Sequence, residues 1–234
     1  MPGTMKVDEA IEGIIQRIID GTFTVDRPLP PEAELAALLD ISRPTLRECV
    51  RSLSDGGVLR VIHGRGTFLA PRQDWHHLPT LITVLSSTTD QLELGIQLTQ
   101  VRRMIEVGAA GLAAQHRTDA DIERMESVLD GYDAAKDAEE AVALDISYHE
   151  LILHASGNPF LSAIMQPLSE ALLTSRRFTT SSADVRRRAQ KHHRRIFDCI
   201  RAGDAQGAKD AMRAHMSQTH DDIVRLGTQH RSLL

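Results

Sequence analysis

The stretch ISRPTLRE, residues 41–48, decides how the N-terminal part of the chain folds. Ser42 is a typical helix N-cap, and Pro44 is tolerated because it falls in the first turn of the helix that follows. That helix is expected to begin at about Arg43 and to end at the glycine pair 56–57. Its apolar side chains share one face: Leu46, Cys49, Val50 and Leu53. Its arginines lie four residues apart and point another way: Arg43, Arg47 and Arg51.

Two helices precede this one and a β-hairpin follows it. Isoleucines at helical spacing predict a first helix over about residues 7–20, and two prolines set up a short second helix over residues 32–39. β-rich runs at residues 58–62 and 67–69 flank a glycine turn, which predicts a hairpin. Three short helices and a hairpin predict a winged helix-turn-helix, which places one helix in the major groove of DNA and the wing on the backbone or minor groove.

Positive charge gathers in this part of a chain that is acidic overall. The formal net charge is -5, yet residues 41–70 carry five arginines and two acidic residues, a net charge of +3. A guanidinium can bond both acceptors of a guanine edge or grip a phosphate, and hydroxyl groups add phosphate donors. The same spacing also fits an ordinary solvated helix face. The candidate DNA contacts from these residues are Ser42, Arg43, Thr45, Arg47, Arg51 and Arg65.

Four motifs in one order resemble the DNA-binding domain of the GntR family over about residues 7–70. They are Leu29-Pro30-Pro31-Glu32, Glu34-Leu35-Ala36, Ile41-Ser42-Arg43-Pro44-Thr45-Leu46-Arg47-Glu48 and His63-Gly64-Arg65-Gly66-Thr67-Phe68. The resemblance implies base or phosphate contacts on the third helix and contacts at the wing tip: Arg43, Arg47, Thr45, His63 and Gly64. Ala33 stands where the family often has a basic residue, and this departure is expected to alter operator preference or affinity.

Beyond Pro71 the periodicity is helical almost everywhere. Breaks divide this part into about seven helices, at residues 86–89, near 117, near 137, at 157–159, 179–182 and 203. Cap residues precede several of them: Asp90, Thr118, Ser182 and Asp204. A linker near residues 71–74 is expected to separate a winged helix-turn-helix domain over residues 1–71 from an all-helical domain over residues 75–229. The expected fold class is therefore mainly α.

Four side chains in the helical part form a candidate metal set. Asp145 and His149 lie four residues apart on a helix and therefore share a face. His193 and His215 lie on two later helices, beside apolar residues that face a bundle core. Three neutral imidazoles and one carboxylate suit a divalent metal, with zinc as the first choice and nickel, manganese or iron(II) as alternatives. Because the chain has 11 histidines, an ordinary hydrogen-bonded or surface role stays open for each of them.

Five further motifs resemble the FCD ligand-binding domain over about residues 92–227. They are Val101-Arg102-Arg103-Met104-Ile105-Glu106, Asp145-Ile146-Ser147-Tyr148-His149, Ala155-Ser156-Gly157-Asn158, His193-Arg194-Arg195-Ile196 and Ala211-Met212-Arg213-Ala214-His215. The resemblance implies that Asp145, His149, His193 and His215 hold the metal. It also implies that Arg102 helps to bind an anionic effector, a small organic or sugar acid.

The same resemblance extends to subfamily and function. Residues 75–85 look like the additional helix of the FadR subfamily. The implied protein is a homodimeric transcription regulator, more a repressor than an activator, that binds an imperfect palindrome in double-stranded DNA and responds to the acid. Two alternatives stay open: a DNA-binding scaffold with a purely structural metal and no effector and, as the weaker one, a metal-dependent enzyme.

Other classes of protein are excluded by what the sequence lacks. No apolar run approaches the roughly 20 residues of a membrane span, and residues 1–10 have no signal-peptide core, so a cytoplasmic protein without membrane contact is expected. His149-Glu150 followed by His154 has the wrong spacing for a zinc peptidase, and no nucleophile elbow or phosphate-binding loop occurs, so no enzyme is expected. The basic run over residues 186–195 is interpreted as a solvated helix face paired with acids.

Overall fold

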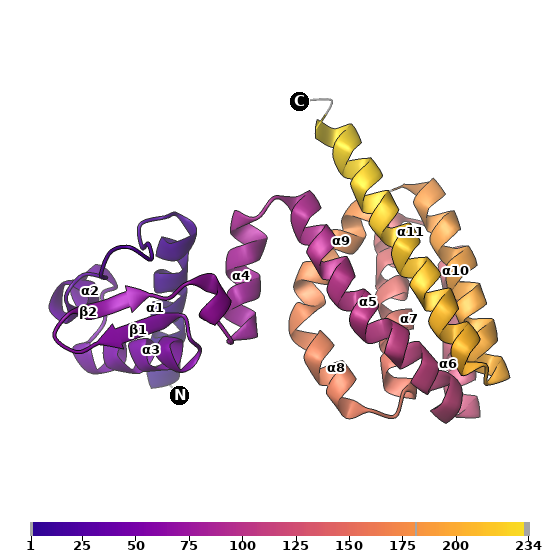
Figure 1. The fold of residues 1–234 in the computed structure, drawn as a ribbon, viewed down its shortest axis with the longest axis horizontal. Coiled ribbons are helices and arrows are strands. Elements are labelled where there is room, and N and C mark those ends of the chain that lie inside the picture. Colours follow the sequence, from indigo (N-terminus) through magenta and orange to yellow (C-terminus); the bar gives the residue numbers. More distant parts are fainter. Residues whose placement is uncertain (1, 181, 232–234) are drawn as a thin grey trace. The chain divides into compact units, whose positions relative to one another are not determined.

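The computed structural model describes residues 2–180 and 182–231, and side chains within residues 7–180 and 182–228. The chain forms two compact units, Met1–Thr89 and Asp90–Leu234 (Figure 1). Helices dominate both units, and the strands of the described residues form one antiparallel pair. The predicted mainly α fold class is confirmed. No helix among the described residues is long and apolar enough to cross a bilayer.

The first unit contains the expected three helices and hairpin, followed by a fourth helix. Its elements are α1 (Pro2–Ile19), α2 (Glu32–Leu38), α3 (Arg43–Asp55), β1 (Leu59–Ile62), β2 (Gly66–Leu69), a 3-10 turn (Arg72–Asp74) and α4 (Leu78–Thr88). The strands pair from Leu59 opposite Leu69 to Ile62 opposite Gly66. Ile14, Leu46 and Cys49 are buried in one core, where each large apolar side chain contributes roughly 1.5–3 kcal/mol to stability.

The segment after the hairpin folds back onto the first unit. Trp75 is buried, and the backbone N–H groups of the next two residues donate to the Gly56 carbonyl at 3.0 and 3.1 Å. Val84 of α4 lies in the same core as α1 and α3. Because of this packing, the first compact unit extends to Thr89, beyond the linker that the sequence predicts near residues 71–74.

The second unit is a bundle of seven α-helices with one 3-10 turn among the described residues. Its elements are α5 (Gln91–His116), α6 (Asp119–Ala134), α7 (Ala138–Ala155), α8 (Pro159–Met165), a 3-10 turn (Gln166–Leu168), α9 (Ser169–Thr180), α10 (Ala183–Ala202) and α11 (Ala205–Arg231). Asp90, Thr118 and Ser182 cap α5, α6 and α10, and Asp204 accepts a bond from the first turn of α11. The predicted helix boundaries thus follow from local cap chemistry.

α5 brings the bundle together. α7, α9, α10 and α11 all pack against it, and α11 runs along both α5 and α10 (Figure 1). The inward side chains of α5, α7, α9, α10 and α11 therefore converge on one interior region. The predicted ligands lie on three of these helices, α7, α10 and α11.

Candidate functional site

The start of α3 is the first candidate surface. The Ser42 hydroxyl accepts the backbone N–H of Thr45 at 3.3 Å and lies 2.8 Å from the Thr45 hydroxyl. Arg43 is exposed and has no ion pair among the described residues. N–H groups at a helix N-terminus favour anions, and a free guanidinium beside them adds charge. This corner of the molecule therefore suits a phosphate or a base edge.

The other two arginines of α3 are already paired. Arg47 holds Glu32 of α2 with its Nε at 3.0 and 3.1 Å from the two carboxylate oxygens, and this hydrogen bonding raises the pKa of Arg47. Arg51 lies 3.8 Å from Asp55. Both arginines are exposed, and ion pairs in water are weak, so a nucleic-acid phosphate could displace either carboxylate.

The wing presents its tip to solvent. His63, Gly64 and Arg65 are all exposed, and the Arg65 guanidinium lies 5.8 Å from the ring centre of Phe68. Gly64 has a φ of 73°, which side-chain-bearing residues rarely adopt, and no atom lies within 4 Å of where a Cβ would stand. The tip can therefore approach a nucleic-acid backbone closely.

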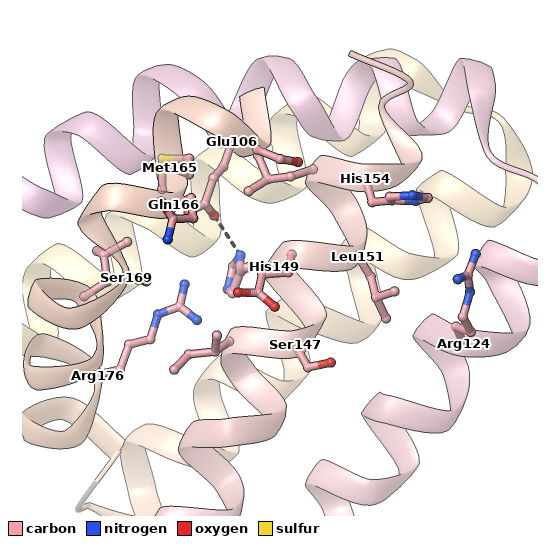
Figure 2. A pocket seen from close by; sticks show the side chains of 15 residues that line it. Glu106, Arg124, Ser147, His149, Leu151, His154, Met165, Gln166, Ser169 and Arg176 are labelled. Atoms are coloured by element: carbon pink, nitrogen blue, oxygen red, sulfur yellow. Dashed lines mark ion pairs between the residues drawn. The ribbon is translucent and has the colours of Figure 1, made fainter. Parts of the chain in front are cut away.

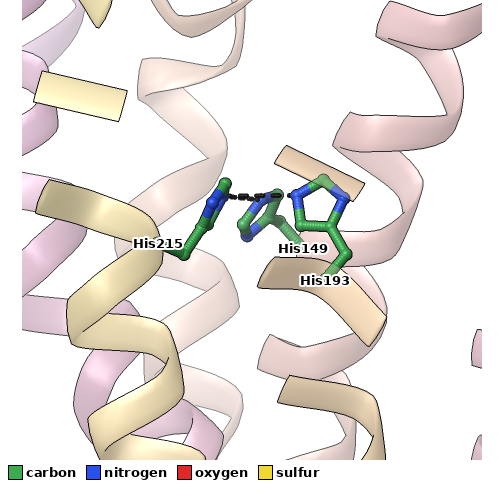
Figure 3. Close-up of side chains that lie close together, drawn as sticks. All are labelled: His149, His193 and His215. Atoms are coloured by element: carbon green, nitrogen blue, oxygen red, sulfur yellow. Dashed lines mark hydrogen bonds between the residues drawn. The ribbon is translucent and has the colours of Figure 1, made fainter. Parts of the chain in front are cut away.

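Three buried histidines from three helices meet in the second unit (Figure 3). The Nε2 atoms of His193 and His215 are 3.2 Å apart, and those of His215 and His149 are 3.3 Å apart. Potential ligand atoms of all three lie within 4.8 Å of one another, and each residue is at most 3% exposed. The structure thus brings together the three histidines of the predicted metal set.

The spacing of the imidazole nitrogens fits a metal ion. Two nitrogens at about 2.0–2.1 Å from a tetrahedral zinc stand about 3.3 Å apart, which the two Nε2 separations match. At His193 and His215 a bound cation would give the facing Nε2 lone pairs a common partner, and at His149 it would displace Arg102 Nη2. The donor set therefore fits a divalent metal.

A carboxylate lies behind one of these histidines. Glu106 on α5 places Oε2 2.7 Å from Nδ1 of His149 (Figure 2). Its Oε1 lies 2.7 Å from Nε of Arg102. A carboxylate on the far nitrogen fixes the tautomer and orientation of a metal-binding histidine. Arg102 Nη2 in turn lies 3.0 Å from the His149 Nε2 atom. Glu106 is therefore a positioning residue for His149, with Arg102 as its partner.

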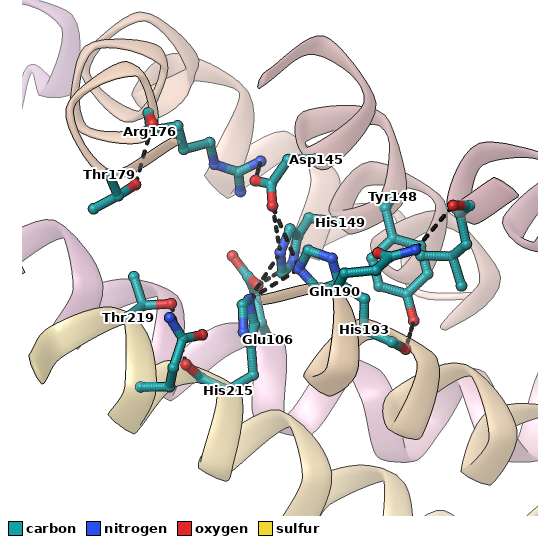
Figure 4. A network of polar contacts seen from close by, with 12 residues as sticks. Glu106, Asp145, Tyr148, His149, Arg176, Thr179, Gln190, His193, His215 and Thr219 are labelled. Carbon is teal, nitrogen blue, oxygen red and sulfur yellow. Dashed lines mark hydrogen bonds and ion pairs between the residues drawn. The ribbon is translucent and has the colours of Figure 1, made fainter. Parts of the chain in front are cut away.

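Asp145 stands between the histidines and a second buried arginine (Figure 4). Its Oδ1 is 3.3 Å from Nε2 of His193 and 4.0 Å from that of His149, while its Oδ2 is 2.8 Å from Nη1 of Arg176. One carboxylate oxygen thus lies beside His193 and His149, and the other faces a guanidinium. Among the described residues, the ligand atoms that lie within 4.8 Å of one another come from the three histidines and not from Asp145.

Burial controls protonation in this cluster. Desolvation lowers the pKa of all three histidines, that of His193 to about 3 and that of His215 well below its usual value. Burial would raise the pKa of Asp145, but the charge of Arg176 brings it down to about 2. The pKa of Glu106 falls below its usual range because the charge of Arg102 and hydrogen bonds from Arg102 and His149 outweigh burial. At neutral pH the cluster holds neutral imidazoles and ionised carboxylates, which are the forms that bind metals.

This pattern predicts that acid destabilises the metal-free helical unit. Unfolded histidines protonate near pH 6.5, whereas His193 stays neutral in the folded state down to about pH 3. The unfolded chain therefore binds more protons below pH 6.5, and the free energy of unfolding should fall by up to about 1.4 kcal/mol per pH unit for each such histidine. Urea unfolding at pH 7.5, 6.5 and 5.5 measures this loss.

The aromatic residues allow the two units to be followed separately. The only tryptophan, Trp75, lies in the first unit, and both tyrosines, Tyr132 and Tyr148, lie 5.6 and 5.1 Å from the ring of His193. The free energy of unfolding reported by the tyrosine signal should fall as the pH falls. His193→Asn should make it depend less on pH, whereas replacing the exposed His154 should leave its pH dependence unchanged. A tyrosine-reported stability that is unchanged or higher at pH 5.5 would contradict the assignment.

Two cavities reach the cluster. The larger, about 550 Å³, runs beside α7, α8 and α9 and touches Glu106, His149 and Arg176 (Figure 2). The smaller, about 20 Å³, is bordered by Arg102, Asp145, Arg176 and His215. The larger cavity is in the size range of small-molecule sites.

Two residues of the cluster are absent from the predicted site. For Glu106 the sequence does hold a signal, because it lies four residues after Arg102 on one helix. Arg176 had no local signal, because its partner Asp145 lies on another helix. The basic run on α10 does pair with acids as predicted, since Arg188 contacts Asp184 and Asp222 and Arg194 contacts two aspartates of α6.

Comparisons with known proteins agree with both units. Residues 6–69 match the family described as bacterial regulatory proteins, gntR family, and residues 97–218 match the FCD domain. The galactonate operon transcriptional repressor of Escherichia coli (strain K12) is 32% identical over 88% of this chain and 91% of its own length. LutR, an HTH-type transcriptional regulator of Bacillus subtilis (strain 168), is 30% identical over 80% of this chain and 87% of its own length.

Solved structures share the fold. Streptococcus agalactiae GntR has 26% sequence identity and a TM-score of 0.51, covering 92% of this chain and 99% of that one. A Listeria monocytogenes protein, Lar, has a TM-score of 0.59 at 15% identity over 94% of this chain and 96% of its own, which supports the fold alone. The Escherichia coli and Bacillus subtilis relatives are a transcriptional repressor and a transcriptional regulator, so a metal-dependent enzyme is set aside. The chain belongs to the GntR family of bacterial transcriptional regulators and carries an FCD domain, as in the FadR-like subfamily.

Proposed function

We propose that this regulator is a homodimeric repressor whose affinity for DNA is lowered when an organic or sugar acid binds beside a metal in the helical unit. The observation that carries the proposal is the buried cluster of three neutral histidines, two carboxylates and two arginines. Buried charge is costly, and a chain that needed only a stable bundle would be served as well by apolar residues.

The charges of the cluster favour an anion once a metal is present. Arg102 and Arg176 balance Glu106 and Asp145, and the imidazoles are neutral. A divalent cation held by Asp145 and the three histidines would add two positive charges to an interior that water does not screen. A carboxylate would compensate that charge, and a metal supplies it with a Lewis-acid partner. Zinc is our first choice of metal, and nickel, manganese or iron(II) are alternatives.

Two features indicate how the acid is held and which class it belongs to. Arg102, whose guanidinium already faces the histidines, is proposed to contribute to its binding. A relative that covers most of the chain is named a galactonate operon repressor, which supports both the sugar-acid class and repression as the mode of control.

The DNA side of the proposal uses the candidate contacts on α3 and the wing. A homodimer would place two copies of α3 in successive major grooves, about 34–36 Å apart, on an imperfect palindrome. Contacts are proposed for Ser42, Arg43, Thr45, Arg47 and Arg51 on α3, and for His63, Gly64 and Arg65 on the wing. The proposed place of action is the cytoplasm, where bacterial DNA lies.

A genomic selection tests the function as a whole. The zinc-loaded full chain is expected to enrich fragments that contain an imperfect palindrome, and an added sugar acid such as D-galactonate is expected to release them. If no fragment is preferred over random duplex, the DNA-binding proposal fails. If fragments are enriched but no organic or sugar acid releases them, the alternative of a DNA-binding protein with a purely structural metal is favoured instead.

A further inference from the structure

The two buried arginines of the helical unit differ in how many of their guanidinium N–H groups have a hydrogen-bond partner. Arg102 gives Nε and Nη2 to both oxygens of Glu106, at 2.7 and 3.3 Å. Arg176 forms an ion pair with Asp145, in which Nη1 lies 2.8 Å from Oδ2. Its Nε and Nη1 make no hydrogen bond of acceptable geometry to any described residue, although only 6% of the residue is exposed. Arg176 therefore has N–H donors that can still bind an anion, whereas Arg102 already donates to Glu106.

A buried guanidinium with unused donors is costly unless an anion reaches it. Arg176 borders both cavities of the cluster, so an anion in either could contact it.

We propose that Arg176 is the main anchor for the effector carboxylate, and that the body of the effector lies in the larger cavity between α7, α8 and α9. This inference rests on the proposed function. In Figure 2 the guanidinium of Arg176 points toward His149 from the α9 side of the cavity, with Gln166 and Ser169 on the same side. A planar guanidinium holds a carboxylate through two parallel bonds, which a surface lysine cannot do.

The lining of the cavity indicates the class of acid. Hydroxyl and amide groups line it together with a few apolar side chains: Ser147, Ser162, Gln166, Ser169, Leu151 and Leu172. Its volume of about 550 Å³ exceeds the needs of a three-carbon acid. A polyhydroxylated carboxylate of about six carbons would fill more of the space and pair its hydroxyls with the serines and the glutamine. We therefore assign the site to aldonic acids rather than to lactate.

Calorimetric titration of the zinc-loaded full chain with D-gluconate, D-galactonate and L-lactate tests the assignment. At least one aldonate should bind more tightly than L-lactate. Arg176→Gln should weaken that binding by about 10- to 100-fold, the size of a lost charged hydrogen bond, with zinc content unchanged. Arg177→Gln is the matched control, because Arg177 is the next residue on α9 and pairs at the surface with Glu139.

The outcomes separate the two proposals. If wild-type protein binds an aldonate and Arg176→Gln binds it equally well, the role of Arg176 is wrong while the proposed function stands. If the wild type binds no aldonate, or binds L-lactate more tightly, the assigned class of acid is wrong. Arg176→Lys keeps the buried charge and decides the matter should the glutamine variant fail to fold: it should still lose affinity, and wild-type affinity in it would overturn the anchor.

Discussion

Replacing Arg43 or Arg47 by alanine is expected to abolish sequence-specific DNA binding while leaving the helical content unchanged. A good bidentate contact to a base contributes about 1–3 kcal/mol to discrimination, and a dimer loses two such contacts at once, so roughly 2–6 kcal/mol is expected to disappear. Both side chains are exposed, and neither belongs to the core of the first unit. Fluorescence anisotropy with the selected operator at fixed salt measures the loss.

Two further variants make this result specific. Arg201→Ala removes one positive charge from an exposed site on α10 and should leave operator affinity unchanged. Glu32→Gln removes the carboxylate that competes with DNA for Arg47, so it should preserve or increase affinity. If Arg43→Ala and Arg47→Ala bind the operator like the wild type, α3 is not the recognition helix.

Replacing His193 and His215 together by alanine is expected to remove the metal completely. The two imidazoles supply two of the four proposed ligands, and the remaining pair, Asp145 and His149, lies on one helix. Elemental analysis should find about one divalent ion per protomer in the wild type and almost none in the double variant. Glu106→Gln should keep all four ligands but lower metal affinity by about 10- to 100-fold, because the negative charge beside the His149 Nδ1 atom is lost.

The matched control uses histidines outside the cluster. His154 and His220 are not among the converging histidines, and replacing both should leave the metal content intact. Full metal occupancy in the His193 and His215 double variant would remove these residues as ligands. Metal loss in the control double variant would show that the signal comes from surface histidines instead.

Local chemistry made much of the fold predictable. The N-caps at Ser42, Asp90, Thr118 and Ser182 start helices where the sequence predicts, because each cap needs only its own first turn. The hairpin follows equally from its glycine turn. The boundary between the two units was harder to predict from the sequence. Trp75 and Val84 join the first core through contacts with distant residues, and no local pattern encodes such contacts.

The candidate site was predictable only in part, for the same reason. Helical spacing and the resemblance to a known family brought Asp145, His149, His193 and His215 to one region before the structure was known. The pairing of Arg102 with Glu106 could be predicted, because Glu106 lies one helical turn away. The role of Arg176 could not be predicted, since it depends on the packing of α9 against α7, which the sequence alone does not specify.

The most direct test of the account measures operator affinity in a cycle of metal and effector. The dissociation constant of the zinc-loaded wild type is determined with and without a saturating aldonate at fixed salt, and again for the His193→Ala, His215→Ala double variant. The account predicts that the aldonate weakens wild-type binding by about 5- to 150-fold and leaves the double variant unaffected. Equal wild-type affinities with and without aldonate, or an unchanged response in the double variant, would contradict it.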